Sequence, residues 1–400
     1  MHIDEKKLGL VLPGGGARGA FQVGVLKAIA ELLPLDSHNP FPILSGTSAG
    51  AINATVIASK ARRFRFAAAE LDRVWGNFRS EQVFESDAWT MLKSSMHWMA
   101  ALVFGGLLVK NPRSLLNNEP LGRLLERNVH FSRIQSGIDR GFVEALAITA
   151  AGYHSARSVT FFQAAAHLHP WERTRRVGIR VPVNLDHLMA SIAVPMIFPP
   201  TQIHGEYYGD GAMRQATPLS PAVHLGADRI LVIGVRDEVA NPAVDPSEPD
   251  QYPSFGQIAG YMLDTLFLDG LYSDLERLTR VNELLDSIPP QHRRGFAARM
   301  RPIDTMIVVP SQDLSKIAAE HLSELPRPTR VLLRGIGGRN HAESRLVSFL
   351  LFESGYTRAL IDLGYKDAMK VKDELTAFIQ GADVPRLFAP AWLKRDLSGL

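Results

Sequence analysis

Residues 41–53 of the 400-residue chain read FPILSGTSAGAIN, a strand pattern and a helix pattern joined by a glycine-rich turn. It begins with the apolar run Phe41–Leu44, which has the length of a buried strand, and ends in an alanine-rich segment with the composition of a helix. Ser48 falls in the tight turn between them, and Gly46 and Gly50 leave room for the bend. The pattern predicts a nucleophile elbow, in which a strained corner aims the serine hydroxyl outward at a helix N-terminus.

The elbow has one structural alternative. In a glycine-rich turn, Ser48 can simply cap the helix that follows, since serine is a preferred N-cap residue. The glycine-rich segment before the elbow and an aspartate far beyond it favour the catalytic interpretation.

A second glycine turn precedes the elbow. The apolar strand pattern Leu8–Leu12 runs into PGGGARG, and a helical periodicity follows over residues 20–33. Consecutive glycines let a backbone come close to a ligand and turn several N–H groups toward one point, and Arg18 brings a permanent positive charge to the rim. The segment predicts an oxyanion cradle, whose members are Gly14, Gly15, Gly16, Arg18 and Gly19.

The same glycines also fit the dinucleotide fingerprint G-x-G-x-x-G. That motif requires a second strand that ends in an acidic residue about 20 positions on. Asp36 lies near that distance, but residues 34–40, PLDSHNP, have the composition of a loop. A nucleotide-dependent oxidoreductase is therefore kept as an alternative that NAD or FAD binding would revive.

A candidate base stands in residues 203–212, IHGEYYGDGA. Asp210 lies between two glycines at the end of a short strand, where its carboxylate is free to approach another loop, and Gly211 and Ala212 complete the turn. The alternative is a plain Asp-Gly hairpin. With the elbow present, Asp210 is the best candidate to deprotonate Ser48.

Strand and helix patterns alternate through the rest of the chain. Strands are expected at residues 143–150, 158–162, 229–235 and, last, 305–309. Helices are expected over most of 61–130, with a cap at Asn118, and over 185–193, 256–285 and 326–380. The apolar turn Met196–Pro200 predicts a wall of the site. The pattern predicts an α/β catalytic domain at 1–320, with helical insertions at about 61–130 and 256–300, and a C-terminal helical extension at 321–400.

Composition limits the function classes. Apolar content of 46% and charged content of 21% are typical of a folded protein. The net charge is +3, and no nucleic-acid recognition module accompanies the arginine clusters at 62–65, 173–176 and 293–294, which are expected to be solvated faces. Cysteine is absent, which excludes disulfides and thiolate sites, and no Asp/Glu/His cluster has metal-ligand spacing. We expect no nucleic acid, no metal and no cofactor.

The N-terminus predicts a cytoplasmic protein, because the charged residues 1–7 lead straight into a strand pattern without a signal-peptide core. The uncharged stretch 94–109 is shorter than the ~20 residues of a spanning helix. It predicts either an ordinary core helix or an interfacial helix in contact with a membrane.

Four blocks, in this order, resemble the patatin-like phospholipase family. They are Gly14–Gly19 (GGGARG), Gly46–Gly50 (GTSAG), a weaker Ala190–Pro195 (ASIAVP) followed by Phe198 and Pro199, and Asp210–Ala212 (DGA). Together they span about half of the chain. The resemblance implies a three-layer α/β/α sandwich with a mainly parallel central sheet. It also implies a lipid acyl hydrolase that cleaves carboxylic esters of phospholipids or related lipids and meets the inner face of the membrane transiently.

The family resemblance further implies a serine-aspartate dyad without histidine. Ser48 would attack the ester, Asp210 would take its proton, and the N–H groups of Gly15 and Gly16 would hold the oxyanion. Arg18 would support that loop or face the lipid phosphate. Pro13 stands where several relatives carry a polar residue, which leaves the hydrogen bonding of the first turn open.

Two alternatives to the dyad enzyme remain. One is a Ser-His-Asp triad in the order serine, acid, histidine, with His224 or His341 as the third member. The other is a non-catalytic lipid-binding or regulatory protein on the same fold. An exposed aspartate has a pKa of about 3.9, so a dyad requires a dry site that raises the proton affinity of Asp210.

Overall fold

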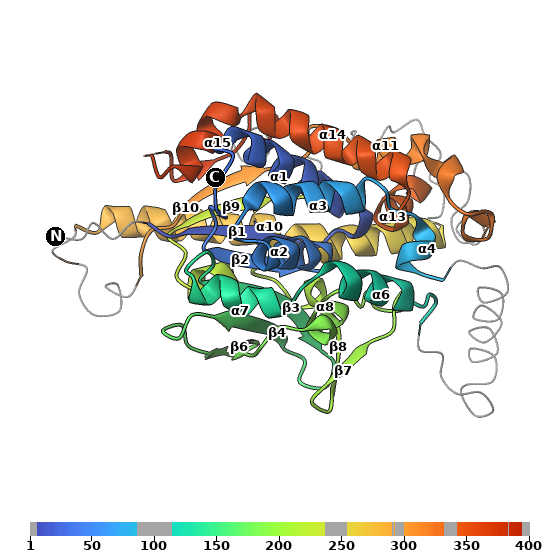
Figure 1. Cartoon of the computed structure of the whole chain (residues 1–400), viewed down its shortest axis with the longest axis horizontal. Coiled ribbons are helices and arrows are strands. Elements are labelled where there is room, and N and C mark those ends of the chain that lie inside the picture. The colour runs from blue at the N-terminus through green and yellow to red at the C-terminus, as the bar shows by residue number, and fades with distance from the viewer. Residues whose placement is uncertain are drawn as a thin grey trace.

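In the part of the chain that the structure describes, eleven strands form one mixed sheet with helices on both faces (Figure 1). The structure is a computed structural model, and it describes residues 6–85, 114–236, 254–289, 292, 300–331, 342–382 and 384–393. The predicted helix at 94–109, His341 and the arginine cluster at 293–294 lie outside these residues.

The sheet is parallel in its centre and antiparallel at one side. Its strands are β1 (Leu8–Leu12), β2 (Ile43–Thr47), β3 (Ala145–Gly152), β4 (Ser158–Ala164), β5 (Trp171–Arg173), β6 (Arg176–Arg180), β7 (Thr201–Ile203), β8 (Glu206–Asp210), β9 (Arg229–Ile233), β10 (Asp304–Val308) and β11 (Leu387–Phe388). The order is β11-β10-β9-β1-β2-β3-β4-β6-β5, with β8 paired to both β3 and β7. The strands from β11 to β3 are parallel, and β4 and β8 run antiparallel to β3.

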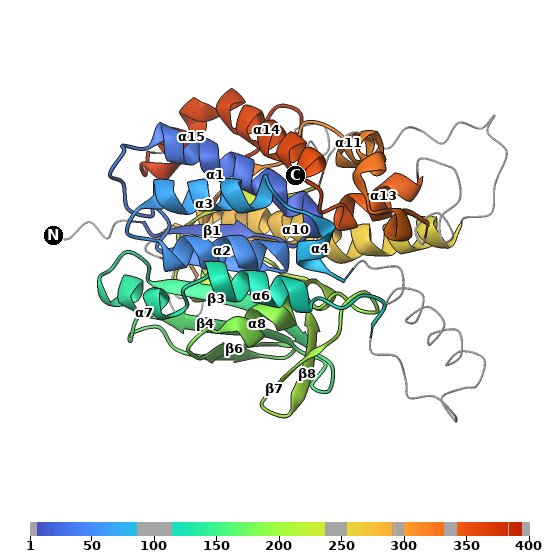
Figure 2. The same ribbon diagram turned by 45° about the vertical axis from the view of Figure 1, so that its right-hand side comes forward.

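Helices cover both faces of this sheet. They are α1 (Ala20–Leu32), α2 (Ala49–Ser59), α3 (Phe64–Trp75), α4 (Ser80–Val83), α6 (Glu119–Asn128), α7 (Ser132–Asp139), α8 (Leu185–Ser191), α9 (Ser220–His224), α10 (Phe255–Ser287), α11 (Leu314–Glu320), α13 (Ala342–Leu350), α14 (Ser354–Lys370) and α15 (Lys372–Ile379). Two views place α4, α13 and the start of α10 at the same edge of the molecule (Figures 1 and 2).

Two of the hydrophobic clusters lie on opposite faces of the sheet and explain why both faces are covered. On β1, Leu10 and Leu12 belong to the core shared with α1, α2 and α14, whereas Val11 belongs to the core shared with α9 and α10. Successive side chains of a strand point to opposite faces, so a strand that is apolar throughout requires a layer on each side. The fold is therefore the predicted α/β/α sandwich with a mainly parallel sheet.

The structure corrects two expectations about strands. The strand at 304–308 is not the last one, because β11 pairs with β10 after the C-terminal helices. The hairpin β5–β6 was not predicted. Its exposed, arginine-rich strands lack an apolar run, because β5 lies at the end of the sheet and β6 is only partly buried. The predicted domain boundary at residue 320 remains a prediction, although α14 packs closely on α1.

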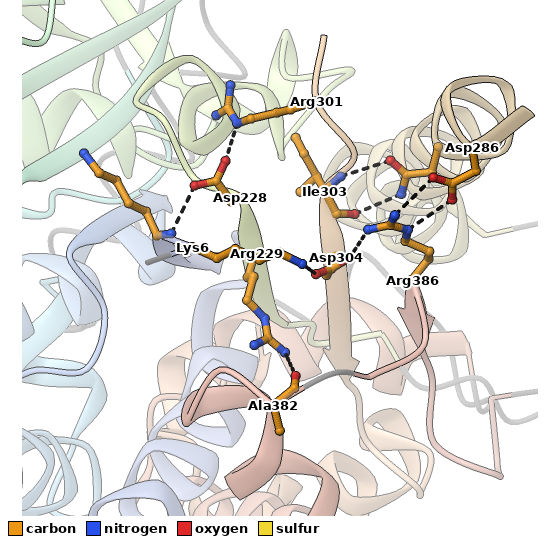
Figure 3. A network of polar contacts seen from close by, with 11 residues as sticks. Lys6, Asp228, Arg229, Asp286, Arg301, Ile303, Asp304, Ala382 and Arg386 are labelled. Atoms are coloured by element: carbon orange, nitrogen blue, oxygen red, sulfur yellow. Dashed lines mark hydrogen bonds and ion pairs between the residues drawn. The ribbon is translucent and has the colours of Figure 1, made fainter. Parts of the chain in front are cut away.

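A network of charges ties the C-terminal strand to the sheet (Figure 3). Asp304 at the start of β10 accepts hydrogen bonds from Lys6 Nζ at 2.8 Å and from Arg386 at 2.7 Å. Arg386 also bonds Asp286 at the end of α10 through two contacts of 3.1 Å. These residues lie at the amino ends of the parallel strands. The network therefore links the strands at the end of the sheet opposite their carboxyl ends.

Candidate active site

The register of β3 brings Ser48 and Asp210 together. On β3, Thr149 is paired with Thr47, the last residue of β2, and Ala150 is paired with Asp210, the last residue of β8. Because β4 occupies the other side of β3 over these residues, β8 continues along the side where β2 ends. Ser48, the next residue after β2, therefore lies beside Asp210, although the two are far apart in the sequence.

Ser48 occupies a strained turn. Its backbone has φ 53° and ψ −127°, and the residue is buried. A Cβ atom on Gly46 would lie 2.4 Å from the Gly50 carbonyl oxygen, and one on Gly50 would lie 2.0 Å from the Leu12 carbonyl oxygen. The side chain of Ser48 makes no capping hydrogen bond to α2, so the helix-cap alternative is wrong. The geometry is that of an elbow that aims the hydroxyl away from its own helix.

The Asp210 carboxyl group is buried beside this hydroxyl. Burial raises the pKa of Asp210 from its ordinary 3.8 to about 7, and the Ser48 hydroxyl and the Ala212 N–H act in the opposite direction. Oδ1 accepts a hydrogen bond from the Ala212 N–H at 2.9 Å, whereas Oδ2 has no hydrogen-bond partner among the described residues. A short 3₁₀ turn at Gly211–Met213 follows, so the plain hairpin alternative is wrong. The carboxylate therefore has both the proton affinity and the free oxygen that a base needs.

The glycine turn lies directly over Ser48. A Cβ atom on Gly14 would lie 3.0 Å from the Ser48 Cβ, and one on Gly16, which has φ +55°, would lie 2.2 Å from the Phe349 carbonyl oxygen. No described residue accepts a hydrogen bond from the N–H groups of Gly14, Gly15 or Gly16. These donors are therefore available to an oxyanion formed at Ser48.

The first turn is hydrogen-bonded through the backbone of Pro13. The Pro13 carbonyl oxygen accepts a bond from Gln22 Nε2 at 2.9 Å, and Gln22 is fully buried in α1. The dinucleotide alternative does not fit this arrangement. The strand after α1 is β2, which ends at Thr47 rather than at an acidic residue, and Asp36 lies in a turn.

Arg18 does not lie at the rim, and that expectation was wrong. Its side chain is 1% exposed, and its guanidinium donates to Ser348 Oγ at 2.9 Å and to Ser315 Oγ at 3.2 Å. It also lies 4.1 Å from the centre of the Phe349 ring and 3.5 Å from Asp264. Arg18 thus joins the glycine turn to α10, α11 and α13 and cannot face a lipid phosphate from this position.

Gly19 allows close packing between the glycine turn and two helices. A Cβ atom there would lie 2.9 Å from the Ala49 Cβ and 3.1 Å from the Trp75 ring. The absence of a side chain lets the glycine turn approach the start of α2, which brings the two turns together.

An apolar pocket opens onto Ser48. Its lining comes from α2, α3, α4, α6, α10, α13 and the turn after α8, and the residues are Gly16, Ser48, Ala49, Ile52, Trp75, Phe78, Val83, Leu121, Ile192, Val194, Ile197, Phe198, Leu263, Phe267, Phe349, Leu350 and Phe352. Ile197 and Phe198 confirm the prediction that residues 196–200 form a wall. Apart from Ser48, the lining has no hydroxyl, amide or charged side chain, so the pocket suits a hydrocarbon chain.

Two supporting residues were missed as functional candidates. Ser191 accepts a hydrogen bond from the Ser48 N–H at 2.9 Å. Gln215 accepts one from the hydroxyl of Thr47 and donates to Thr149 Oγ1 at 3.3 Å. Ser191 belongs to the weak third block and carried a signal there, whereas nothing in the sequence around Gln215 distinguishes it from a surface glutamine.

The described histidines do not complete a triad. His224 lies at the end of α9, where its Nδ1 bonds to Ser220 and its ring stacks on Trp171 at 5.0 Å. Burial lowers the pKa of His224, and no described histidine lines the pocket. Within the described ranges, no group of three or more His, Asp or Glu residues is arranged to hold a metal ion, and no helix combines the length and apolarity needed to cross a bilayer.

Comparisons with known proteins give a family and one curated relative. The family model described as Patatin-like phospholipase matches residues 10–223, which is more than half of the chain. A segment of 57 residues is 49% identical to "Lysophospholipase nte1" of Aspergillus terreus (strain NIH 2624 / FGSC A1156), and it makes up 14% of this chain and 3% of that protein.

Two solved structures are similar to this chain at a low level. VipD from Legionella pneumophila has a TM-score of 0.35 and 13% identity, with 92% of this chain and 67% of that chain covered. Human GIVD cytosolic phospholipase A2, in complex with methyl gamma-linolenyl fluorophosphonate, has a TM-score of 0.40 and 13% identity, with 94% and 60% covered.

Proposed function

Because this chain belongs to the patatin-like phospholipase family, we propose that it is a serine lipid acyl hydrolase that uses a Ser48–Asp210 dyad. Family membership supports a lipid hydrolase. The observation that carries the dyad is the buried Asp210 carboxyl group, with a pKa of about 7, beside the strained Ser48 turn at an apolar pocket. The ester bonds cleaved are those of phospholipids or related lipids.

In the proposed reaction, Asp210 relays a proton from Ser48 to the departing alcohol. Ionised Asp210 takes the Ser48 proton as the hydroxyl oxygen attacks the ester carbonyl, and the N–H groups of Gly15 and Gly16 stabilise the oxyanion. Protonated Asp210 then gives the proton to the departing alcohol. Water attacks the acyl-enzyme in the same way, and the proton returns to Ser48. Because only the ionised carboxylate is a base, kcat/KM should fall as the pH drops below about 7.

The pocket indicates which part of the substrate enters. Its aromatic and aliphatic walls suit an acyl chain, with the ester carbonyl at Ser48 and the polar remainder of the lipid outside. An enzyme that draws acyl chains from a lipid phase works at its surface. We therefore propose a transient peripheral association with the inner face of the cytoplasmic membrane.

A lipid panel analysed by mass spectrometry tests the function. Wild type should release fatty acid from at least one ester class, and Ser48→Ala and Asp210→Asn should each lose about 10³-fold or more of that rate. A fluorophosphonate should label wild type at Ser48. A folded wild type that releases no acid and takes no label would favour the non-catalytic lipid-binding alternative.

His224→Ala is the control for the triad alternative. His224 lies away from the pocket, so the variant should keep most of the hydrolytic rate. Loss of that rate in a variant that remains folded would overturn the dyad in favour of a triad.

A further inference from the structure

The turn that ends α8 is bonded to the backbone of both proposed reacting residues. The Ser48 N–H donates to Ser191 Oγ at 2.9 Å, and the Asp210 N–H donates to the Ala193 carbonyl oxygen at 2.8 Å. Ser191 and Ala193 are two positions apart and both are buried. A single short segment therefore contacts the elbow and the base at once.

The Ser191 hydroxyl has a fixed direction. It donates its proton to the Thr149 carbonyl oxygen at 2.7 Å, and its oxygen is then left to accept the Ser48 N–H. Thr149 is the β3 residue that is paired with the end of β2. Because the proton is already used, the hydroxyl acts as a bridge between β3 and the elbow rather than as a nucleophile.

We infer that Ser191 is a positioning residue that sets the separation of the Ser48 hydroxyl and the Asp210 carboxylate. The inference rests on the proposed function and deepens it. A left-handed φ at a non-glycine residue persists only where its surroundings hold it, and the bond to Ser191 is one of those constraints. Without an acceptor, the buried Ser48 N–H would pull the turn toward another partner and move the hydroxyl.

This displacement has a consequence that a simple loss of stability lacks. The Ser48 hydroxyl lowers the pKa of Asp210 against the larger effect of burial. If the hydroxyl moves away, the pKa of Asp210 rises, and the acidic limb of the pH–rate profile moves to higher pH. Substrate binding in the pocket should change little, since Ser191 does not line it.

The test is Ser191→Ala, assayed on a soluble p-nitrophenyl ester from pH 5 to pH 9. We expect kcat to fall about 10–100-fold, because a displacement of about 1 Å at reacting atoms has an effect of that size. KM should stay within about two-fold of wild type, and the acidic limb should move upward.

Ser59→Ala is the matched control. Ser59 is a buried serine at the end of α2 whose hydroxyl donates to the Val56 carbonyl oxygen at 2.9 Å, and it has no contact with Ser48 or Asp210. Its removal deletes the same buried group, so it should lower the melting temperature while leaving kcat and the acidic limb unchanged.

Ser191→Cys keeps the inference testable if the alanine variant does not fold. The thiol keeps the side-chain length but is a weaker donor and acceptor, so kcat should lie between those of wild type and the alanine variant. Wild-type kcat and an unmoved acidic limb in either folded variant would overturn the inference and leave the proposed function intact. Absence of hydrolysis and of fluorophosphonate labelling in wild type would overturn both.

Discussion

At the scale of single residues, burial of the ionised Asp210 carboxylate lowers the stability of the folded protein. The folded protein holds the pKa of this carboxyl group at about 7, against an ordinary 3.8, because the group is buried. The folded state therefore binds the proton more tightly than the unfolded state. The contribution of Asp210 to the free energy of unfolding is therefore fully present below pH 4 and is lost as the pH rises through about 7.

Asp210→Asn should therefore stabilise the protein while it abolishes hydrolysis. At pH 8 the variant no longer buries a charge, and we expect its free energy of unfolding to exceed that of wild type by on the order of a few kcal/mol. At pH 4, where wild-type Asp210 is protonated, the gain should disappear. Urea denaturation at the two pH values measures the difference, and an equal effect at both would contradict the burial of an ionised group.

The glycine turn offers a second test at this scale. Gly16 and Gly141 both have positive φ, of 55° and 75°, but a Cβ atom on Gly16 would lie 2.2 Å from the Phe349 carbonyl oxygen, and one on Gly141 would meet nothing within 4 Å. Gly141→Ala should lower the free energy of unfolding by about 1–2 kcal/mol through backbone strain alone. Gly16→Ala should lower the free energy of unfolding by at least about 2 kcal/mol more than Gly141→Ala, because the backbone must move to make room for the Cβ atom. It should also remove most of the activity.

Equal losses in the two alanine variants would mean that the turn does not pass close to α13. Thermal unfolding and the soluble ester assay, run on both proteins, separate the two outcomes.

At the scale of elements, Arg18 connects the glycine turn to three helices from the C-terminal half of the sequence. Its partners come from α10, α11 and α13, of which α10 and α13 also line the pocket. These three helices therefore help to hold the glycine turn and the pocket wall in place. The sequence alone assigned them no role.

Arg18→Lys tests this connection. A lysine keeps the charge but cannot match the planar fork of hydrogen bonds, so we expect the free energy of unfolding to fall by about 2–4 kcal/mol. The ratio of activities on phospholipid and triacylglycerol should not change, because the side chain does not face the substrate. A selective loss on phospholipid, measured in a folded variant, would restore the interpretation that Arg18 binds the lipid phosphate.

At the scale of the whole molecule, the Asp304 network links the amino ends of β10 and β11 to the end of α10 (Figure 3). Burial by itself would raise the pKa of Asp304, but hydrogen bonds from Lys6 and Arg386 lower it overall. A lowered pKa stabilises the folded state above the ordinary pKa of an aspartate, and that contribution disappears as the pH falls through the lowered value.

Arg386→Ala should weaken the attachment of β11. The side chain of Arg386 is 43% exposed, so solvent screens the interaction, and we expect a loss of only about 1 kcal/mol at pH 7 and less at pH 3. Activity should be unaffected, because the network lies far from Ser48. Denaturation at both pH values, with Arg301→Ala as a neighbouring control that bonds Asp228 instead, checks the assignment.

Much of the site followed from local patterns, because strands, glycine turns and helices are specified by residues close together in the chain. Local patterns predicted the strand-turn-helix units at 8–32 and 43–59, the glycines that permit both turns, and Asp210 as the candidate base. The burial of Arg18 was not, since its partners lie about 250 to 330 positions away. The β5–β6 hairpin and β11 were missed because their pairing depends on neighbouring strands rather than on their own apolar pattern.

Local patterns in the sequence are sufficient to predict the α/β class, the two glycine turns and the candidate pair Ser48 and Asp210, since each rests on short-range backbone geometry. That the pair meets follows from the three-dimensional fold alone, because the contact depends on β2 and β8 ending at consecutive positions of β3. The fold also decides that the carboxyl group is dry and that Ser191 bridges the elbow to β3, because burial and long-range hydrogen bonds exist only once distant segments have packed together.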